Sequence, residues 1–187
     1  MQRIVIIGSS CAGKTTLARQ LSEALSLPHI ELDGLHFLPQ WQTRTTEDFR
    51  AVTEKAVSQE RWVLDGNYSI VRDIVWSRAT HIIWLKYPFP LVMRRCLRRT
   101  ILRAWNQEEL FSGNYETFRQ SFFSRDSIIW WVIKSFRRRQ RDYNALFQDL
   151  PYPQLQTLTF THPSATERWL CSLEATQGSQ QLVELPG

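Results

Sequence analysis

Short apolar runs alternate with amphipathic stretches along most of the chain, and this alternation predicts the secondary structure. Residues 3–7, 62–64 and 81–85 are nearly continuous apolar runs, which is typical of strands buried on both faces of a sheet. Residues 29–33 and 155–160 alternate between apolar and polar positions and predict two further strands. Between the strands, apolar residues recur three or four positions apart, as in helices with one buried face. The expected helices are residues 16–27, 46–59, 69–75, 91–104, 128–150 and 164–175.

Strands that alternate with helices of this length predict βαβ units and a parallel sheet. We expect one doubly wound α/β domain over residues 1–175, a helical insertion at about 105–136 and a flexible tail at 176–187. A chain of 187 residues is long enough for one well-buried core. Residues 34–44 are rich in aromatics and predict a loop, and Thr45 is an expected helix N-cap with an acid three residues on.

The composition excludes several classes of protein. The apolar content of 43% is ordinary for a globular domain, and no stretch matches the roughly 18 apolar residues of a membrane-spanning helix. The first predicted strand begins almost at once and leaves no room for a leader peptide. Three well-separated cysteines, Cys11, Cys96 and Cys171, favour reduced thiols in a cytoplasmic protein. Cys11 either fills a small loop position or has a redox role beside a helix N-terminus. The apolar run Ile128–Ile133 is expected to pack against the core, with membrane contact as the alternative.

The formal net charge is +5, and the excess arginines lie between Arg94 and Arg141. The helix predicted at 91–104 has five arginines and no acid. Like charges one helical turn apart repel each other by a few tenths of a kcal/mol per pair. An anionic partner such as ATP, a phosphorylated substrate or nucleic acid explains this cluster, and a plain basic face is the alternative. The five residues are Arg94, Arg95, Arg98, Arg99 and Arg103.

Residues 8–15 read Gly-Ser-Ser-Cys-Ala-Gly-Lys-Thr, a complete GxxxxGK[ST] phosphate-binding motif. The motif follows a predicted strand and precedes a predicted helix, as phosphate binding requires. Backbone N–H groups at the helix N-terminus converge on an anion, and Lys14 supplies a mobile charge for the β- and γ-phosphates. The Thr15 hydroxyl is a ligand for Mg²⁺, so ATP and Mg²⁺ are the predicted cofactors. The residues expected at the nucleotide are Gly8, Ser9, Ser10, Cys11, Ala12, Gly13, Lys14, Thr15 and Thr16.

Two aspartates follow predicted strands, and ligands of parallel sheets bind at the carboxyl ends of strands. Asp65 is expected to hold Mg²⁺ together with Thr15, unless it only starts an Asp-Gly turn. Asp33 is able to orient an acceptor hydroxyl and take its proton, with a turn before Gly34 as the equal alternative. Three further residues are candidates for substrate binding, namely His36, Arg44 and Asn67. A structural role is the alternative for His36, and a surface role is the equal alternative for Arg44.

Together these motifs resemble the nucleoside-monophosphate-kinase-like P-loop kinases. The phosphate loop, Asp65-Gly66 and the arginine-rich region follow that plan, although Asn67-Tyr68 replaces the Phe-Pro-Arg of adenylate kinases. A closer resemblance, over roughly residues 3–170, is to the adenylate-kinase-like DNA topology modulation proteins. It implies an ATP-binding kinase fold with the strand order 2-3-1-4-5, and it supports Asp33 as a substrate-side residue. The matching segments are Leu32–Arg44, residues 62–68, Ile83-Trp84-Leu85 with Pro88, Arg94–Arg103 and Gly113-Asn114-Tyr115-Glu116.

Two functions fit these residues. The first is an ATP- and Mg²⁺-dependent phosphotransferase for a small molecule or nucleotide, in which Lys14 and Asp33 act at the reacting groups. Three arginines would close over the transferring phosphoryl group, namely Arg98, Arg99 and Arg103. The alternative is a nucleotide-regulated protein that binds nucleic acid through its arginines and neighbouring aromatics. The two aspartates favour the kinase, because a binding protein has no task for them. The sequence specifies neither the acceptor nor the oligomeric state.

Overall fold

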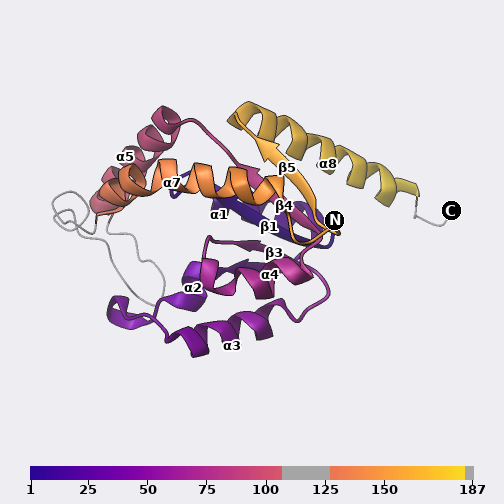
Figure 1. The fold of residues 1–187 in the computed structure, drawn as a ribbon. Helices are drawn as coiled ribbons and strands as arrows, with labels where there is room; N and C mark the ends of the chain where they lie inside the picture. Colours follow the sequence, from indigo (N-terminus) through magenta and orange to yellow (C-terminus); the bar gives the residue numbers. More distant parts are fainter. Residues whose placement is uncertain (107–126, 184–187) are drawn as a thin grey trace.

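The computed structural model has a five-stranded parallel sheet at its centre, with helices on both faces (Figure 1). The structure describes residues 1–106 and 127–183. The strand order is β2-β3-β1-β4-β5, and each neighbouring pair is parallel. This arrangement confirms the predicted doubly wound α/β fold and its strand order. The strands are β1 (Arg3–Gly8), β2 (His29–Glu31), β3 (Trp62–Asp65), β4 (His81–Leu85) and β5 (Gln156–Phe160).

Helices follow each strand and return the chain to the start of the next one, as right-handed parallel connections require. The α-helices are α1 (Lys14–Leu25), α2 (Leu32–His36), α3 (Thr46–Val57), α4 (Arg72–Arg78), α5 (Phe89–Asn106), α7 (Ile128–Gln148) and α8 (Pro163–Val183). Two 3₁₀ turns, η1 (Pro39–Trp41) and η2 (Ser69–Val71), lie in the connections.

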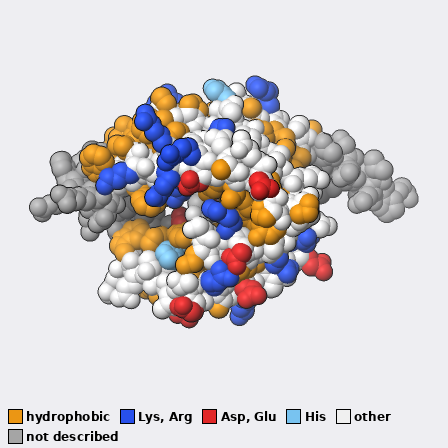
Figure 2. All heavy atoms as spheres, in the orientation of Figure 1, with side chains coloured by type: hydrophobic (Ala, Val, Ile, Leu, Met, Phe, Trp, Pro, Cys, Tyr) orange, Lys and Arg blue, Asp and Glu red, His pale blue; other side chains and the backbone are white. Residues whose placement is uncertain are grey.

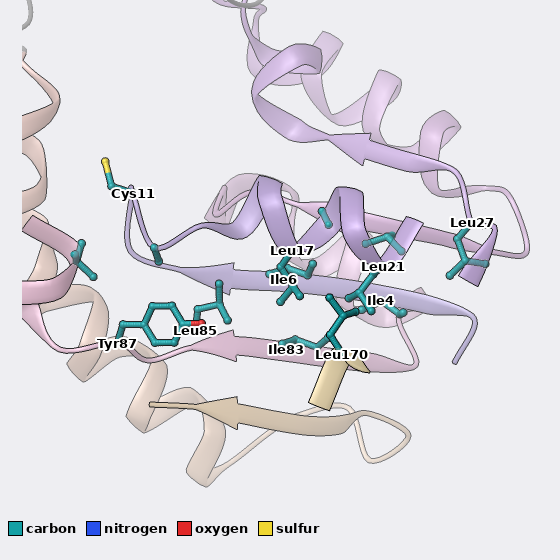
Figure 3. Packing of buried hydrophobic residues seen from close by; sticks show 14 of the residues in the cluster. Ile4, Ile6, Cys11, Leu17, Leu21, Leu27, Ile83, Leu85, Tyr87 and Leu170 are labelled. Atoms are coloured by element: carbon teal, nitrogen blue, oxygen red, sulfur yellow. The ribbon is translucent and has the colours of Figure 1, made fainter. Parts of the chain in front are cut away.

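The sheet separates two hydrophobic cores. Successive residues of β1 point to opposite faces, so that Ile4 and Ile6 enter one core and Val5 and Ile7 the other. The first core includes side chains of α1, α5 and α8, and Figure 3 shows its packing around β1, β4 and α1. The second includes side chains of α3, α4 and the second half of α7. Full burial of each such aliphatic side chain stabilises the fold by roughly 1.5–3 kcal/mol.

The segment after β2 folds differently from the predicted loop. The strand ends at Glu31, and the short helix α2 begins at Leu32, which places Asp33 in a first helical turn instead of at a strand end. The prediction of a strand reaching Asp33 is therefore wrong. Leu32 is only 2% exposed, and it is buried against Gly66 at the end of the neighbouring strand β3. Burial of Leu32 thus favours the start of the helix at this residue. Asp33 in the first turn stabilises the helix because its negative charge lies near the positive end of the helix dipole.

Most other element boundaries agree with the predictions. Thr45 caps α3, since its side chain accepts a hydrogen bond from the backbone N–H of Asp48 at 3.1 Å. Ser69 opens a 3₁₀ turn and does not cap α4 with its side chain. Helix α7 begins at Ile128 as predicted, and α8 continues past the expected end at Ala175 to Val183. Of the predicted insertion and tail, residues 107–126 and 184–187 lie outside the described part of the chain.

The apolar run at the start of α7 is packed on one side only. Val132 is buried in the core, while Trp130, Trp131 and Ile133 are 44–49% exposed. The prediction that this run packs against the core is therefore correct for part of its residues. Among the residues that the structure describes, no helix has the length and apolar character to cross a bilayer.

The close approach of Gly66 to Leu32 generates a prediction about stability. A Cβ atom added at Gly66 would lie 2.6 Å from Leu32 Cβ, and the φ angle of Gly66 is +139°. Gly66→Ala is therefore expected to lower the free energy of unfolding by roughly 2–4 kcal/mol, through overlap and backbone strain. Urea denaturation followed by circular dichroism measures this change. A loss below about 0.5 kcal/mol, typical of surface substitutions, would contradict it.

Candidate functional site

The segment Gly8–Thr15 forms a tight loop between β1 and the first turn of α1. Its backbone turns through the left-handed region at Cys11, with φ of 63°, and at Gly13, with φ of 99°. The backbone N–H of Ala12 donates to the carbonyl of Ser9 at 3.1 Å. A Cβ atom at Gly8 would lie 2.9 Å from the carbonyl oxygen of Leu85 on the adjacent strand, so only glycine fits there. The loop therefore has the geometry that the phosphate-binding motif predicts.

Two side chains hold this loop from opposite sides. From the end of β3, the Asn67 amide donates to the carbonyl oxygen of Gly8 and accepts from its N–H at 3.4 Å. From α5, Arg95 Nη1 donates to the carbonyl oxygen of Ala12 at 2.7 Å, and its guanidinium lies 5.3 Å from the centre of the Tyr87 ring. Asn67 thus supports the phosphate loop, and its expected contact with substrate stays a prediction. The sequence analysis missed the corresponding role of Arg95.

A cluster of oxygen atoms surrounds Thr15 at the start of α1. The Thr15 hydroxyl is 2.5 Å from Asp65 Oδ2 and 3.3 Å from Glu31 Oε1. The other carboxylate oxygen of Asp65 is 3.0 Å from His29 Nε2. Asp65 is only 3% exposed, so these two contacts fix its orientation. The predicted pairing of Thr15 with Asp65 is therefore present.

The donor set around Thr15 fits Mg²⁺. Hydroxyl and carboxylate oxygens are ligands that Mg²⁺ prefers, and in phosphoryl-transfer sites this ion keeps several waters and binds one or two protein carboxylates. In the described ranges, no group of three or more His, Cys, Asp or Glu side chains is arranged as a metal cage. Thr15, Asp65 and Glu31 are therefore the residues that would hold a Mg²⁺ ion arriving with a nucleotide.

Glu31 and His29 belong to this cluster although the sequence analysis passed over them. The strand pairing places Glu31 directly opposite Asp65, because β2 and β3 are neighbours in the sheet. Burial raises the pKa of Glu31, and the nearby carboxylates of Asp65 and Asp33 raise it further. The strand order 2-3-1 was the signal that could have identified both residues, since it brings the end of β2 beside Asp65.

Lys14 lies where the charges of four elements meet. Burial lowers the pKa of Lys14, and the positive charges of Arg139 on α7 and Arg99 on α5 act in the same direction. Asp33 and Asp65 oppose this effect by favouring the charged ammonium group. Lys14 Nζ also donates to the carbonyl oxygen of Ser9 at 3.2 Å. Two of the predicted site residues, Asp33 and Asp65, are thus close enough to Lys14 to act on its charge.

Asp33 and Tyr68 form a second polar pair near the loop. The Tyr68 hydroxyl donates to Asp33 Oδ1 at 2.7 Å, and burial raises the pKa of Tyr68, with the charge of Asp33 adding to the effect. The ring of His36 packs between aromatic neighbours, with centroids 4.7 Å from Phe49 and 4.8 Å from Tyr68. Burial lowers the pKa of His36, so its neutral form is favoured. These contacts support the structural alternative for His36.

The remaining predicted residues occupy different surroundings. Arg44 Nε donates to the carbonyl oxygen of Leu35 at 2.9 Å, so this side chain stabilises the α2 segment. On α5, Arg98 is exposed, whereas Arg99 is half-buried and its Nε has no hydrogen-bond partner among the described residues. The side chain of Arg103 lies outside the described part of the chain. Substrate or phosphoryl contacts by these arginines stay predictions.

Arg139 is the main residue that the sequence analysis did not select. It is half-buried on α7, whereas its neighbours Arg137 and Arg138 are exposed. Lysine and arginine side chains gather over α7 on the face shown in Figure 2. The helical period of 3.6 residues could have identified Arg139 from the sequence, because it places this residue on the same helix face as the buried Val132 and Tyr143.

A family match covers this site. Residues 4–75 match the family described as ATPase family associated with various cellular activities (AAA), and this range includes the phosphate loop and both aspartates. The parallel sheet of order 2-3-1-4-5, with the GxxxxGK[ST] loop between β1 and α1, completes the assignment. The fold is that of a P-loop NTPase. No curated protein sequence matches the chain.

Solved structures with this P-loop fold match almost the whole chain. The shikimate kinase from Acinetobacter baumannii in complex with shikimate has a TM-score of 0.58 at 15% identity, with 97% of this chain and 96% of that chain covered. The shikimate kinase from Bacteroides thetaiotaomicron has a TM-score of 0.54 at 19% identity and coverages of 98% and 99%. The shikimate kinase from Aquifex aeolicus has a TM-score of 0.53 at 15% identity and coverages of 96% and 98%. At these identities the likeness establishes the fold.

The raised pKa of Glu31 generates a second prediction. Ionisation of this carboxyl destabilises the folded protein above its folded-state pKa, and the cost is absent below the ordinary value of 4.5. Glu31→Gln is therefore expected to increase the free energy of unfolding at pH 7 in EDTA. Because the side chain is only partly buried, the gain should be a few tenths to about 1 kcal/mol. It should vanish below about pH 4.5.

Denaturant unfolding at several pH values measures this gain. Glu23→Gln, on the exposed side of α1, is the matched control and should change stability little at any pH. Equal effects of the two substitutions, or a loss of stability in Glu31→Gln at pH 7, would overturn the electrostatic interpretation.

Proposed function

We propose that the protein is an ATP- and Mg²⁺-dependent phosphotransferase that acts on a small hydroxyl-bearing acceptor. One observation carries this proposal: two carboxylates flank Lys14, and they have different partners. Asp65 is bonded to Thr15, and Asp33 is bonded to Tyr68 instead. A P-loop protein that only hydrolyses or binds ATP needs the first carboxylate, whereas the second is suited to an acceptor.

The nucleotide half of the site follows from the loop. Backbone N–H groups of residues 9–15 bind the phosphates, and Lys14 neutralises the β- and γ-phosphate oxygens. Thr15 and Asp65 would hold Mg²⁺, with Glu31 next to them, and the ion supplies charge stabilisation to the phosphates when it is bound. The short contact between Thr15 and Asp65 keeps both oxygens on the same side of the loop before the ligand arrives.

On the acceptor side, Asp33 orients the attacking hydroxyl and accepts its proton. The hydrogen bond from Tyr68 holds the carboxylate in place, and the charge of Lys14 keeps it close to the phosphoryl group. The shikimate kinases with the same fold phosphorylate an acceptor of this chemical class by name, namely a small hydroxylated carboxylic acid. We therefore place such acids first among the acceptors to be tested.

Arg99 and Arg139 are suited to the charge that develops on the transferring phosphoryl group. Their charges, from α5 and α7, lower the pKa of Lys14, so three cations act on one another in a partly buried site. Fixed cations in such a site stabilise a phosphoryl transition state more than they do in water. Without a bound anion their mutual repulsion is unfavourable, which favours phosphate as the ligand.

Substitution of Asp33 tests the proposed acceptor role. Asp33→Asn keeps the shape of the side chain but removes the proton acceptor, so kcat should fall by roughly 100-fold or more while the Kd for ATP changes little. The assay is transfer of ³²P from [γ-³²P]ATP to a panel of hydroxylated carboxylic acids, sugars and nucleosides. Asp48→Asn, on the exposed surface of α3, is the matched control and should retain the wild-type rate.

Two outcomes would count against the kinase. One is tight ATP binding with no labelled acceptor in the panel. The other is an Asp33→Asn enzyme that is as active as the control. DNA binding that weakens steeply with salt, combined with no transfer, would favour the alternative of a nucleotide-regulated nucleic-acid-binding protein. Membership of the DNA topology modulation group stays a prediction.

Substitution of Arg139 separates a phosphoryl contact from a structural role. Arg139→Ala is expected to lower kcat/KM by roughly 100-fold, because removal of one fixed cation from a phosphoryl-transfer site has effects of this order. Arg138→Ala, at the exposed neighbouring position of α7, should leave kcat/KM within about 2-fold. Thermal unfolding of both variants shows whether the loss follows folding. Equal kcat/KM values for the two variants would exclude the proposed role of Arg139.

A further inference from the structure

Two cysteines from distant parts of the sequence meet at the phosphate loop. Cys11 lies at the tip of the loop between β1 and α1, and Figure 3 shows its side chain there. The two thiols are close enough for Cys11 to raise the pKa of Cys96, which lies on α5. Both residues belong to the same hydrophobic core, with exposures of 9% and 0%. The pair is therefore a dithiol next to the expected nucleotide, and neither the loop motif nor the proposed chemistry accounts for it.

An independent contact shows that α5 and the loop touch at this point. Arg95, the residue before Cys96, donates to the carbonyl oxygen of Ala12, the residue after Cys11. A Cβ atom at Gly13 would lie 3.2 Å from the same guanidinium. Consecutive residues of α5 thus bind consecutive residues of the loop. The proximity of the two thiols follows from this packing of backbone and side chains.

The two thiols differ in accessibility. Cys96 is fully buried, and its pKa is raised by the neighbouring Cys11 thiol and by burial. It is therefore shielded from oxidants in solution, and it gives up its proton only in the step that joins it to Cys11. Cys11 is at the edge of the core, so it is the thiol that a small oxidant reaches first. Cys171, the third cysteine, is exposed on α8.

We propose that Cys11 and Cys96 form a reversible intramolecular disulfide in the presence of a peroxide, and that this bond switches off nucleotide binding. Hydrogen peroxide oxidises the Cys11 thiol to a sulfenic acid and is reduced to water. The Cys96 sulfur then attacks the Cys11 sulfur, and the hydroxyl leaves with the Cys96 proton as a second water. A dithiol such as dithiothreitol reverses the reaction by exchange. The regulatory part rests on the proposed binding of ATP, whereas the formation of the disulfide does not.

The new bond would distort the loop. A disulfide brings two sulfur atoms to about 2.05 Å, which is far shorter than any non-bonded contact between two thiols. The tip of the loop must therefore move toward α5 by more than about 1 Å. Hydrogen bonds from the loop N–H groups to phosphate tolerate only a few tenths of an ångström. We expect the affinity for ATP to fall by at least about 10-fold.

The experiment compares disulfide formation with nucleotide binding. The Cys171→Ser protein, which lacks the exposed thiol, is treated with hydrogen peroxide, and a peptide that joins Cys11 to Cys96 is sought by mass spectrometry after alkylation. Binding of a fluorescent ATP analogue is measured before treatment, after treatment and after dithiothreitol. The expected result is the joined peptide, a fall in affinity of at least about 10-fold and full recovery on reduction. In Cys96→Ala the reduced protein should bind the analogue with unchanged affinity, and no joined peptide should form after peroxide.

Each other outcome contradicts a defined part of the proposal. Absence of the joined peptide, under peroxide that fully oxidises Cys171 in the wild-type chain, overturns the disulfide. Formation of the disulfide with unchanged affinity overturns the switch. If the reduced protein binds no ATP analogue, the proposed function fails, while mass spectrometry still decides whether the disulfide forms. Cys11→Ser serves as a second variant in the mass spectrometry should Cys96→Ala fail to fold.

Discussion

The hydrogen bond between Thr15 and Asp65 is the contact on which the architecture of the site depends. It joins the first turn of α1 to the end of β3, and a buried carboxylate tolerates this position only because both of its oxygens are bonded. The bond exists because β1 and β3 are adjacent and parallel, so the loop after one strand and the last residue of the other meet at one edge. That pairing places the first turn of α1 against the end of β3.

Charge balance around Lys14 is the second constraint. Two carboxylates, Asp33 and Asp65, and two arginines act on one ammonium group in a partly buried region, and Glu31 lies opposite Asp65 on the neighbouring strand. Opposite charges offset part of the desolvation cost, but like charges within each set still repel. A nucleotide with Mg²⁺ would change both sets at once, since its phosphates would pair with the cations and its metal with the carboxylates. The charges around Lys14 are thus suited to a ligand that carries both signs of charge.

The fold was predictable because its signals are local. Continuous apolar strands, helical stripes and the loop motif are each read within about ten residues, and parallel order follows from their alternation. In the candidate site, Lys14 and Thr15 were predictable from one motif, and Asp33 and Asp65 from their positions after predicted strands. Glu31 and Arg139 join the site through pairings between distant elements, and no local pattern marks them. The end of β2 was misjudged because the buried Leu32 continues the strand alternation while its backbone has already turned into a helix.

Helix α5 shows how one sequence pattern serves two surfaces. Its arginines come in adjacent pairs four residues apart, so one member of each pair faces the solvent and the other faces the loop. Arg95 and Arg99 are half-buried, whereas Arg94 and Arg98 are exposed. Cys96 is also buried on this helix, Arg95 donates to the carbonyl oxygen of Ala12 in the phosphate loop, and the charge of Arg99 acts on Lys14. The arginines within each pair repel each other because one helical face makes several different contacts. The carboxylates of Asp33 and Asp65 partly offset this repulsion near Lys14.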